Sequence, residues 1–156
     1  MRRAISLIVF IVLVALAAGI GSQFMPGEWY RGLTKPSWNP PSWVFGPVWT
    51  ALYVMIAISG WLVWRSEGRW RTSMLTFWSA QLVLNAAWSW LFFGLKRPDL
   101  AMIDIVFLWL VIGGFTIGAW RVSRAASLLF VPYWLWVTFA SALNFAIWRL
   151  NARLMI

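Results

Sequence analysis

The sequence predicts an all-α integral membrane protein, a bundle of five transmembrane helices with a long structured loop between the first and the second. Two observations carry this prediction. The 156-residue chain is 62% hydrophobic and only 11% charged, with a mean hydropathy of +0.76, which is more apolar surface than a soluble domain of this size can bury. It also holds five apolar stretches near the ~20 residues that cross a bilayer. Their approximate ranges are 4–24, 44–64, 70–94, 100–120 and 126–148.

The first stretch has two possible interpretations. Arg2 and Arg3 give it a basic start, and Ala15-Leu16-Ala17 resembles the cleavage site of a signal peptide. Its apolar run is long for a signal peptide, however, and it is followed by four further spans. We therefore expect it to be retained as the first helix of the bundle.

The connections after the second, third and fourth stretches are short, at residues 65–71, 95–99 and 121–124. Short connections make neighbouring helices antiparallel, so we expect a single domain over residues 1–156. Seven Lys and Arg residues fall on the amino-terminal side of this bundle and six on the other. The positive-inside rule needs a clear bias and therefore does not decide the orientation.

The loop at residues 25–43 is rich in proline and aromatic residues. Its four prolines fix backbone angles and push the preceding residues toward extended conformations. A flexible linker would instead be rich in Gly and Ser. Two interpretations remain, a semi-rigid lid over the bundle and an interfacial loop anchored by its aromatic rings. The aromatic residues in it are Trp29, Tyr30, Trp38 and Trp43.

Composition removes several classes of chemistry. The chain has no Cys and no His, so disulfides, Cys/His metal sites and His-assisted nucleophiles are excluded. We expect no metal site and no required cofactor. The net charge of +9 lies in short loops that flank the spans, which favours contact with anionic lipid headgroups over nucleic acid. The only carboxylates are Glu28, Glu67, Asp99 and Asp104.

The fifteen tryptophans are the strongest indication of a binding site. Membrane proteins usually place Trp at the two interfaces, yet several of these fall inside the apolar stretches. In the second stretch Trp49 and Tyr53 lie one turn apart. Helical spacing puts polar and aromatic residues on one face of the third and fifth stretches. These faces are Gln81, Asn85, Trp88 and Phe92, and Tyr133, Trp136, Ala140 and Asn144.

Antiparallel topology brings these faces together in the half of the bundle beneath the loop at residues 25–43. Such a site suits a large, flat, mostly apolar ligand with a few polar edges, and Arg31, Lys35 or Arg149 at its rim could pair with ligand carboxylates. The alternative is that the same faces only pack and hydrogen-bond helix to helix. Asp104, one turn into its stretch, is a functional candidate for ion coupling, or else bonds a neighbouring helix or meets water.

The motifs resemble the translocator protein, or tryptophan-rich sensory protein, family (TspO/MBR, the peripheral-type benzodiazepine receptor), in order over nearly the whole chain. The matching runs include Trp29-Tyr30, Lys35-Pro36-Ser37-Trp38-Asn39-Pro40-Pro41, Pro47-Val48-Trp49, Gln81-Leu82, Leu84-Asn85, Phe92-Phe93-Gly94, Val131-Pro132-Tyr133, Phe139-Ala140, Leu143-Asn144 and Trp148-Arg149-Leu150-Asn151.

This resemblance implies a five-helix protein, commonly a homodimer, of a bacterial membrane that senses or transports tetrapyrroles. Its ligands would be porphyrins, namely protoporphyrin IX and haem, and in some members cholesterol and benzodiazepine-type compounds. Sterol binding is only weakly implied, because Phe145 stands where the animal cholesterol motif needs a Tyr. The positions that match the family's ligand contacts are Tyr30, Trp49, Asn85, Trp88, Trp136, Ala140, Leu143 and Asn144.

The resemblance also implies an alternative activity. Some family members are reported to degrade porphyrin in light, with tryptophans that match Trp49 and Trp136. The chain supplies no acid–base machinery for such a reaction, so the chemistry would run through Trp radicals and the bound pigment. Binding without catalysis is therefore the leading interpretation.

Overall fold

A computed structural model describes residues 2–152 of the chain. These residues form six α-helices and one π-helical turn, with no β-strand among them. The elements are α1 (Arg2–Ser22), α2 (Glu28–Gly32), α3 (Ser42–Arg65), α4 (Arg71–Ser89), η1 (Trp90–Gly94), α5 (Pro98–Ala119) and α6 (Arg124–Leu150).

Four helices in the described part of the chain are long and apolar enough to cross a membrane, namely α1, α3, α5 and α6. The chain is therefore an integral, multi-pass membrane protein. This hydropathy criterion finds one span fewer than the five expected. The difference lies in α4, whose 19 residues include Gln81, Asn85 and several hydroxyl side chains.

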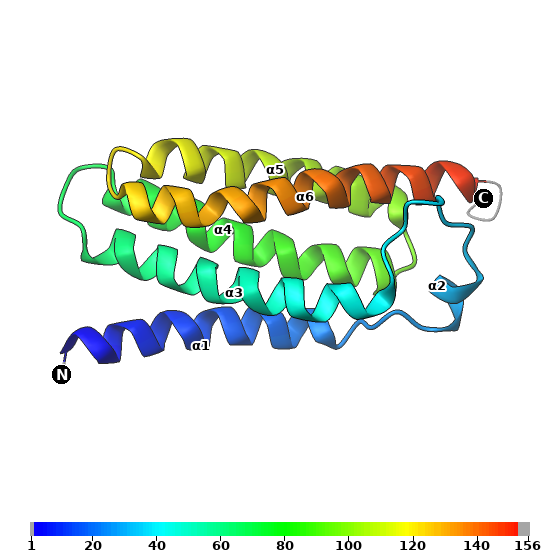
Figure 1. The fold of residues 1–156 in the computed structure, drawn as a ribbon, viewed down its shortest axis with the longest axis horizontal. Helices are drawn as coiled ribbons and strands as arrows, with labels where there is room; N and C mark the ends of the chain where they lie inside the picture. Colours follow the sequence, from blue (N-terminus) through cyan, green and yellow to red (C-terminus); the bar gives the residue numbers. More distant parts are fainter. Residues whose placement is uncertain (1, 153–156) are drawn as a thin grey trace.

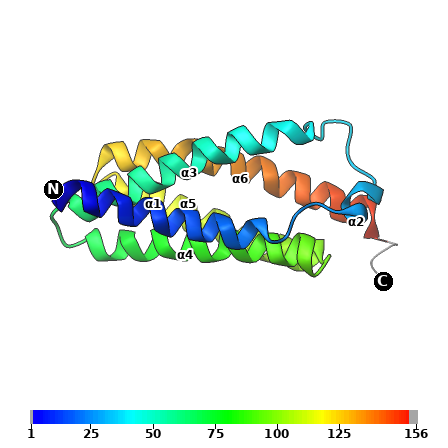
Figure 2. The same ribbon diagram turned by 90° about the horizontal axis from the view of Figure 1, so that it is seen from below.

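The five long helices lie lengthwise beside one another, with the N-terminus at one end and α2 and the C-terminus at the other (Figure 1). Helix α5 packs against α6 and α4, while α1 packs against α3 and α4 (Figure 2). Residues 23–41 connect α1 to α3 and contain the short α2. Helix α3 begins at Ser42, so Trp43 lies in its first turn rather than in the expected loop at 25–43.

The half of the bundle near the N-terminus is tightly packed because glycines admit large side chains. A Cβ on Gly60 would lie 2.4 Å from a ring carbon of Trp78, and the Trp78 Nε1 donates to the Ile56 carbonyl at 2.8 Å. Gly114 and Gly118 of α5 receive Phe77 and Met74 of α4 in the same way. These two glycines therefore serve a close helix contact within the chain.

The π-helical turn η1 widens the end of the third long helix. Its signature is a hydrogen bond over five residues, from the Leu95 amide to the Trp90 carbonyl at 2.8 Å. Gly94 ends the turn and lets the Phe24 ring approach, since a Cβ there would lie 2.8 Å from that ring. The turn thus fits the helix end against the connection that follows α1.

Candidate functional site

A cavity of about 560 Å³ lies in the half of the bundle next to the connection between α1 and α3. All five long helices contribute side chains to it, and so do η1 and the connection. Its volume falls in the range of small-molecule sites, ~300–1,000 Å³. Every ligand-binding residue expected from the sequence lines it. They are Tyr30, Trp49, Asn85, Trp88, Trp136, Ala140, Leu143 and Asn144.

Asn85 forms the polar floor of the cavity. Its Nδ2 donates to the Tyr133 hydroxyl at 3.2 Å, and its Oδ1 accepts from the Tyr53 hydroxyl at 3.4 Å. These bonds tie α4 to α6 and to α3. Asn85 is 8% exposed, whereas Tyr133 is completely buried and does not line the cavity. The floor is therefore held in place by side chains on three helices.

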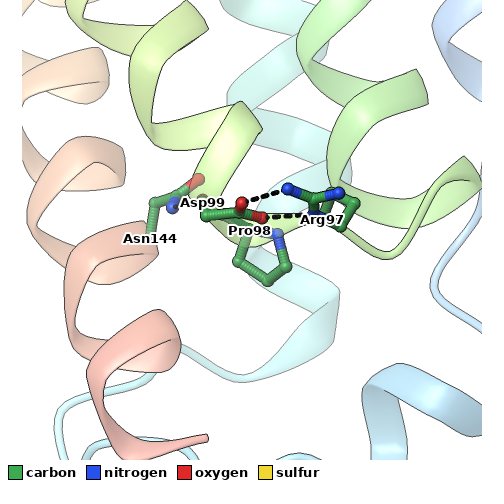
Figure 3. A network of polar contacts seen from close by, with 4 residues as sticks. All are labelled: Arg97, Pro98, Asp99 and Asn144. Carbon is green, nitrogen blue, oxygen red and sulfur yellow. Dashed lines mark hydrogen bonds and ion pairs between the residues drawn. The ribbon is translucent and has the colours of Figure 1, made fainter. Parts of the chain in front are cut away.

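Asn144 joins three helices at the cavity wall near the connection. Its Oδ1 accepts from the Trp88 Nε1 at 3.0 Å, and its Nδ2 donates to the Pro98 carbonyl at 2.9 Å. Figure 3 shows Asn144 of α6 beside the first residues of α5. There Arg97 binds Asp99 with two hydrogen bonds, and this contact raises the pKa of the Arg97 guanidinium. The hydrogen bond from the Trp88 Nε1 to Asn144 thus fixes the orientation of the Trp88 ring at the cavity wall.

Aromatic rings make up much of the remaining wall. Trp88 stacks on Phe92 with ring centroids 5.0 Å apart. Trp49 lies 5.2 Å from Tyr53 on α3, and Phe45 contacts Trp136 of α6 edge to face at 5.8 Å. Pairs in these geometries are favoured beyond the area they bury. They leave a cavity with flat apolar walls.

The connection contributes Tyr30 to the wall of the cavity. The Tyr30 ring packs against Phe92 and Phe93 at 6.2 and 5.4 Å, and burial raises the pKa of its phenol. The connection is attached to the end of α6 by Asn151. This side chain donates to the Thr34 carbonyl at 2.8 Å and accepts from the Thr34 amide at 2.9 Å.

Several residues expected at the site lie outside the cavity wall. Gln81 is fully buried, and neither its Nε2 nor its Oε1 has a hydrogen-bond partner among the described residues. Asp104 is 9% exposed, and its Oδ2 is likewise buried and unpartnered. Arg31, Lys35 and Arg149 do not line the cavity either. Arg31 is instead ion-paired with Glu28.

Sequence reasoning missed the part of the wall contributed by α1 and α5. Ala18 and Ser22 of α1 both line the cavity, together with the glycines between them. The small side chains at this end of α1, whose other residues mostly face lipid, were the sequence feature that could have indicated a cavity wall. Ile105 and Leu108 of α5 had no distinguishing pattern. The remaining lining residues that were not expected include Gly19, Gly21, Phe45, Gly46, Ser89 and Phe93.

A family model described as the TspO/MBR family matches residues 7–149. The chain belongs to the TspO/MBR family. The family predicted from the sequence motifs is thereby confirmed.

Relatives of this TspO/MBR chain come from all three domains of life. Protein CrtK of Rhodobacter capsulatus is 42% identical over 145 residues, covering 92% of this chain and 91% of the relative. Tryptophan-rich protein TspO of Archaeoglobus fulgidus is 43% identical over 147 residues, covering 90% and 94%. The human Translocator protein is 37% identical over 148 residues, covering 91% and 88%. TspO/MBR membership supports a membrane sensory or translocator role.

Proposed function

We propose that the cavity binds porphyrins, protoporphyrin IX and haem among them, and that the protein acts in tetrapyrrole sensing or transport. The observation that carries this proposal is the convergence of Tyr30, Trp49, Asn85, Trp136 and Asn144 on one cavity from four separate segments. No cofactor is needed for such a role, because the porphyrin is itself the ligand.

The chemistry of the wall supports a flat, conjugated ligand. Aromatic side chains offer ring faces for stacking, and the few polar groups can orient a ligand at its edges. Ala140 lies between the large residues Trp136 and Leu143 on α6, and its small side chain leaves room for a planar group. Most of the side chains that line the cavity are apolar, so a ligand gains most from burying apolar surface.

We also propose that α4 with η1 is the fifth transmembrane helix. Together they span 24 residues, from Arg71 to Gly94, and lie alongside α1 and α5. The polar residues that lower the hydropathy, Gln81 and Asn85, are buried inside the bundle and do not face lipid. Homodimer formation in the bilayer is proposed from the family resemblance alone.

A titration of purified protein with protoporphyrin IX tests the binding proposal. Saturable binding is expected, and Trp136→Ala and Asn85→Ala are each expected to weaken it about tenfold, because each removes one wall contact worth about 1.4 kcal/mol. Trp43→Ala is the matched control, since Trp43 is 74% exposed and lies outside the cavity. Binding that does not saturate, or that is equally affected by all three changes, contradicts the proposal.

A second candidate function is light-dependent porphyrin breakdown at the same site. It is favoured by the position of Trp49 and Trp136, which both line the cavity. Neither indole Nε1 donates a hydrogen bond to a side chain or carbonyl of the described residues. Mass spectrometry of illuminated protein with porphyrin measures the products. Products that form unchanged in a Trp49→Phe/Trp136→Phe variant would exclude a reaction directed by the protein.

A further inference from the structure

Four arginines at the end of the bundle opposite the cavity each lie over the ring of a tryptophan. The distance from the guanidinium carbon to the ring centroid is between 4.6 and 5.5 Å in every pair. This is within the ~6 Å reach of a cation–π interaction. The pairs are Arg65 with Trp61, Arg69 with Trp70, Arg71 with Trp64 and Arg124 with Trp120, and we call them the arginine collar.

The collar lies where the helices leave the membrane. Trp61 and Trp64 are near the end of α3, Trp70 immediately precedes α4, and Trp120 follows α5. Three of these rings are between 42% and 48% exposed, as expected for tryptophans at the level of lipid headgroups. Each ring thus has a guanidinium within cation–π reach at this end of the bundle.

The collar arginines have no acidic partner. This end also carries Arg121 and the first residues of α1, Arg2 and Arg3. Its single carboxylate, Glu67, forms no ion pair among the described residues. At the cavity end, by contrast, Glu28 neutralises Arg31 and Asp99 neutralises Arg97. The two ends thus differ in available positive charge although their counts of basic residues are nearly equal.

We propose that the arginine collar is a binding site for the headgroups of anionic phospholipids. A guanidinium that lies over an indole ring makes no hydrogen bond with that ring's face, so its N–H groups stay available to phosphate oxygens, which they can bind in a bidentate geometry. The ring below it reduces the side-chain freedom that would otherwise be lost on binding. A ring of such groups around one end of a membrane bundle meets several headgroups of one leaflet at once. Positive charge that no ion pair neutralises favours anionic over zwitterionic lipid.

Spin-labelled lipids test the proposal on the full-length protein in phosphatidylcholine vesicles. The fraction of label immobilised by the protein is measured for phosphatidylglycerol and for phosphatidylcholine. Wild-type protein is expected to prefer phosphatidylglycerol. The double variant Arg71→Gln/Arg124→Gln is expected to lower this preference by about 5- to 25-fold, since each of the two arginines near the surface contributes up to roughly fivefold. High salt is expected to reduce the wild-type preference as well.

The matched control is Arg31→Gln/Arg97→Gln, which removes the same formal charge from the ion-paired end. It is expected to leave the preference within experimental error of wild type. An equal drop in both double variants, or no drop in the collar variant, overturns the proposal. If the collar double variant does not fold, Arg69→Gln in the exposed turn before α4 gives the same comparison against Arg31→Gln.

The role of the rings is tested separately by Trp120→Leu, which keeps the charge of Arg124 and removes the surface beneath it. The preference for phosphatidylglycerol is expected to fall about twofold, in line with the modest energy of an exposed cation–π pair. An unchanged preference would overturn the stacked geometry as the basis of the site.

Discussion

Replacement of Asn144 by leucine should destabilise the bundle by removing two hydrogen bonds between helices. The Asn144 side chain is 1% exposed and makes one hydrogen bond to Trp88 and one to the Pro98 carbonyl. Leucine has nearly the same shape, so packing is kept while both bonds are lost. The perturbation therefore isolates the polar link between α4, α5 and α6.

The expected magnitude follows from the groups that lose their partners. The Trp88 Nε1 becomes an unsatisfied donor in a low-dielectric wall, at a cost of about 1–3 kcal/mol. The Pro98 carbonyl loses its side-chain donor, which adds about 0.5–1.5 kcal/mol. Hydrogen bonds between membrane helices average only ~0.6 kcal/mol in measured cycles, so the lower part of these ranges applies. A total near 2 kcal/mol is expected.

Thermal unfolding in one detergent, with the double-mutant cycle of Asn144→Leu and Trp88→Phe, measures this link. Trp88→Phe should cost clearly less in the Asn144→Leu background than in the wild type, because the donor that it removes is already without a partner. Strictly additive effects of the two changes would refute the reasoning, since they would mean that the bond of 3.0 Å carries no energy.

Two further predictions concern packing. Ala140→Leu should fill part of the cavity and weaken porphyrin binding about 5- to 150-fold, which corresponds to about 1–3 kcal/mol of overpacking. The control is Ala142→Leu on the exposed face of the same helix, which should leave the porphyrin titration unchanged. Gly60→Ala should lower the thermal unfolding temperature through a clash of about 1–3 kcal/mol, because its methyl group meets the Trp78 ring at 2.4 Å. Gly19→Ala, where an added Cβ meets no atom within 4 Å, should not lower it, and equal losses in the two glycine variants would contradict the packing argument.

Helical periodicity and alternating topology were sufficient to predict which faces meet. The spacing of Asn85 and Trp88 on α4, and of Trp136 and Ala140 on α6, placed these side chains at one cavity without knowledge of helix tilt. The family motifs added Tyr30, whose position in the connection follows no period. The helix ends agreed with the apolar stretches within a few residues, because charged residues and prolines mark them.

Contacts between particular atoms were not predictable in the same way. Gln81 shares the face of Asn85 but lies one turn deeper, where it is buried and does not reach the cavity. Periodicity gives the direction of a side chain and leaves open how deep the cavity extends. The sequence pattern did not predict a role for Trp78 or Trp109, because the contacts of both residues depend on neighbouring helices. Trp78 packs on Gly60 of α3, and the Trp109 Nε1 donates to the Thr138 hydroxyl at 2.7 Å.

The closed packing of the far half of the bundle has a consequence for permeation. Below the cavity, Ile112, Phe115 and Phe130 are completely buried, and the two phenylalanine rings lie with centroids only 4.0 Å apart. These residues belong to one packed hydrophobic cluster, and none of them lines the cavity. A ligand that crossed the bilayer from this cavity would have to part the Phe115 and Phe130 rings, whereas a ligand that is only sensed there would leave them in contact.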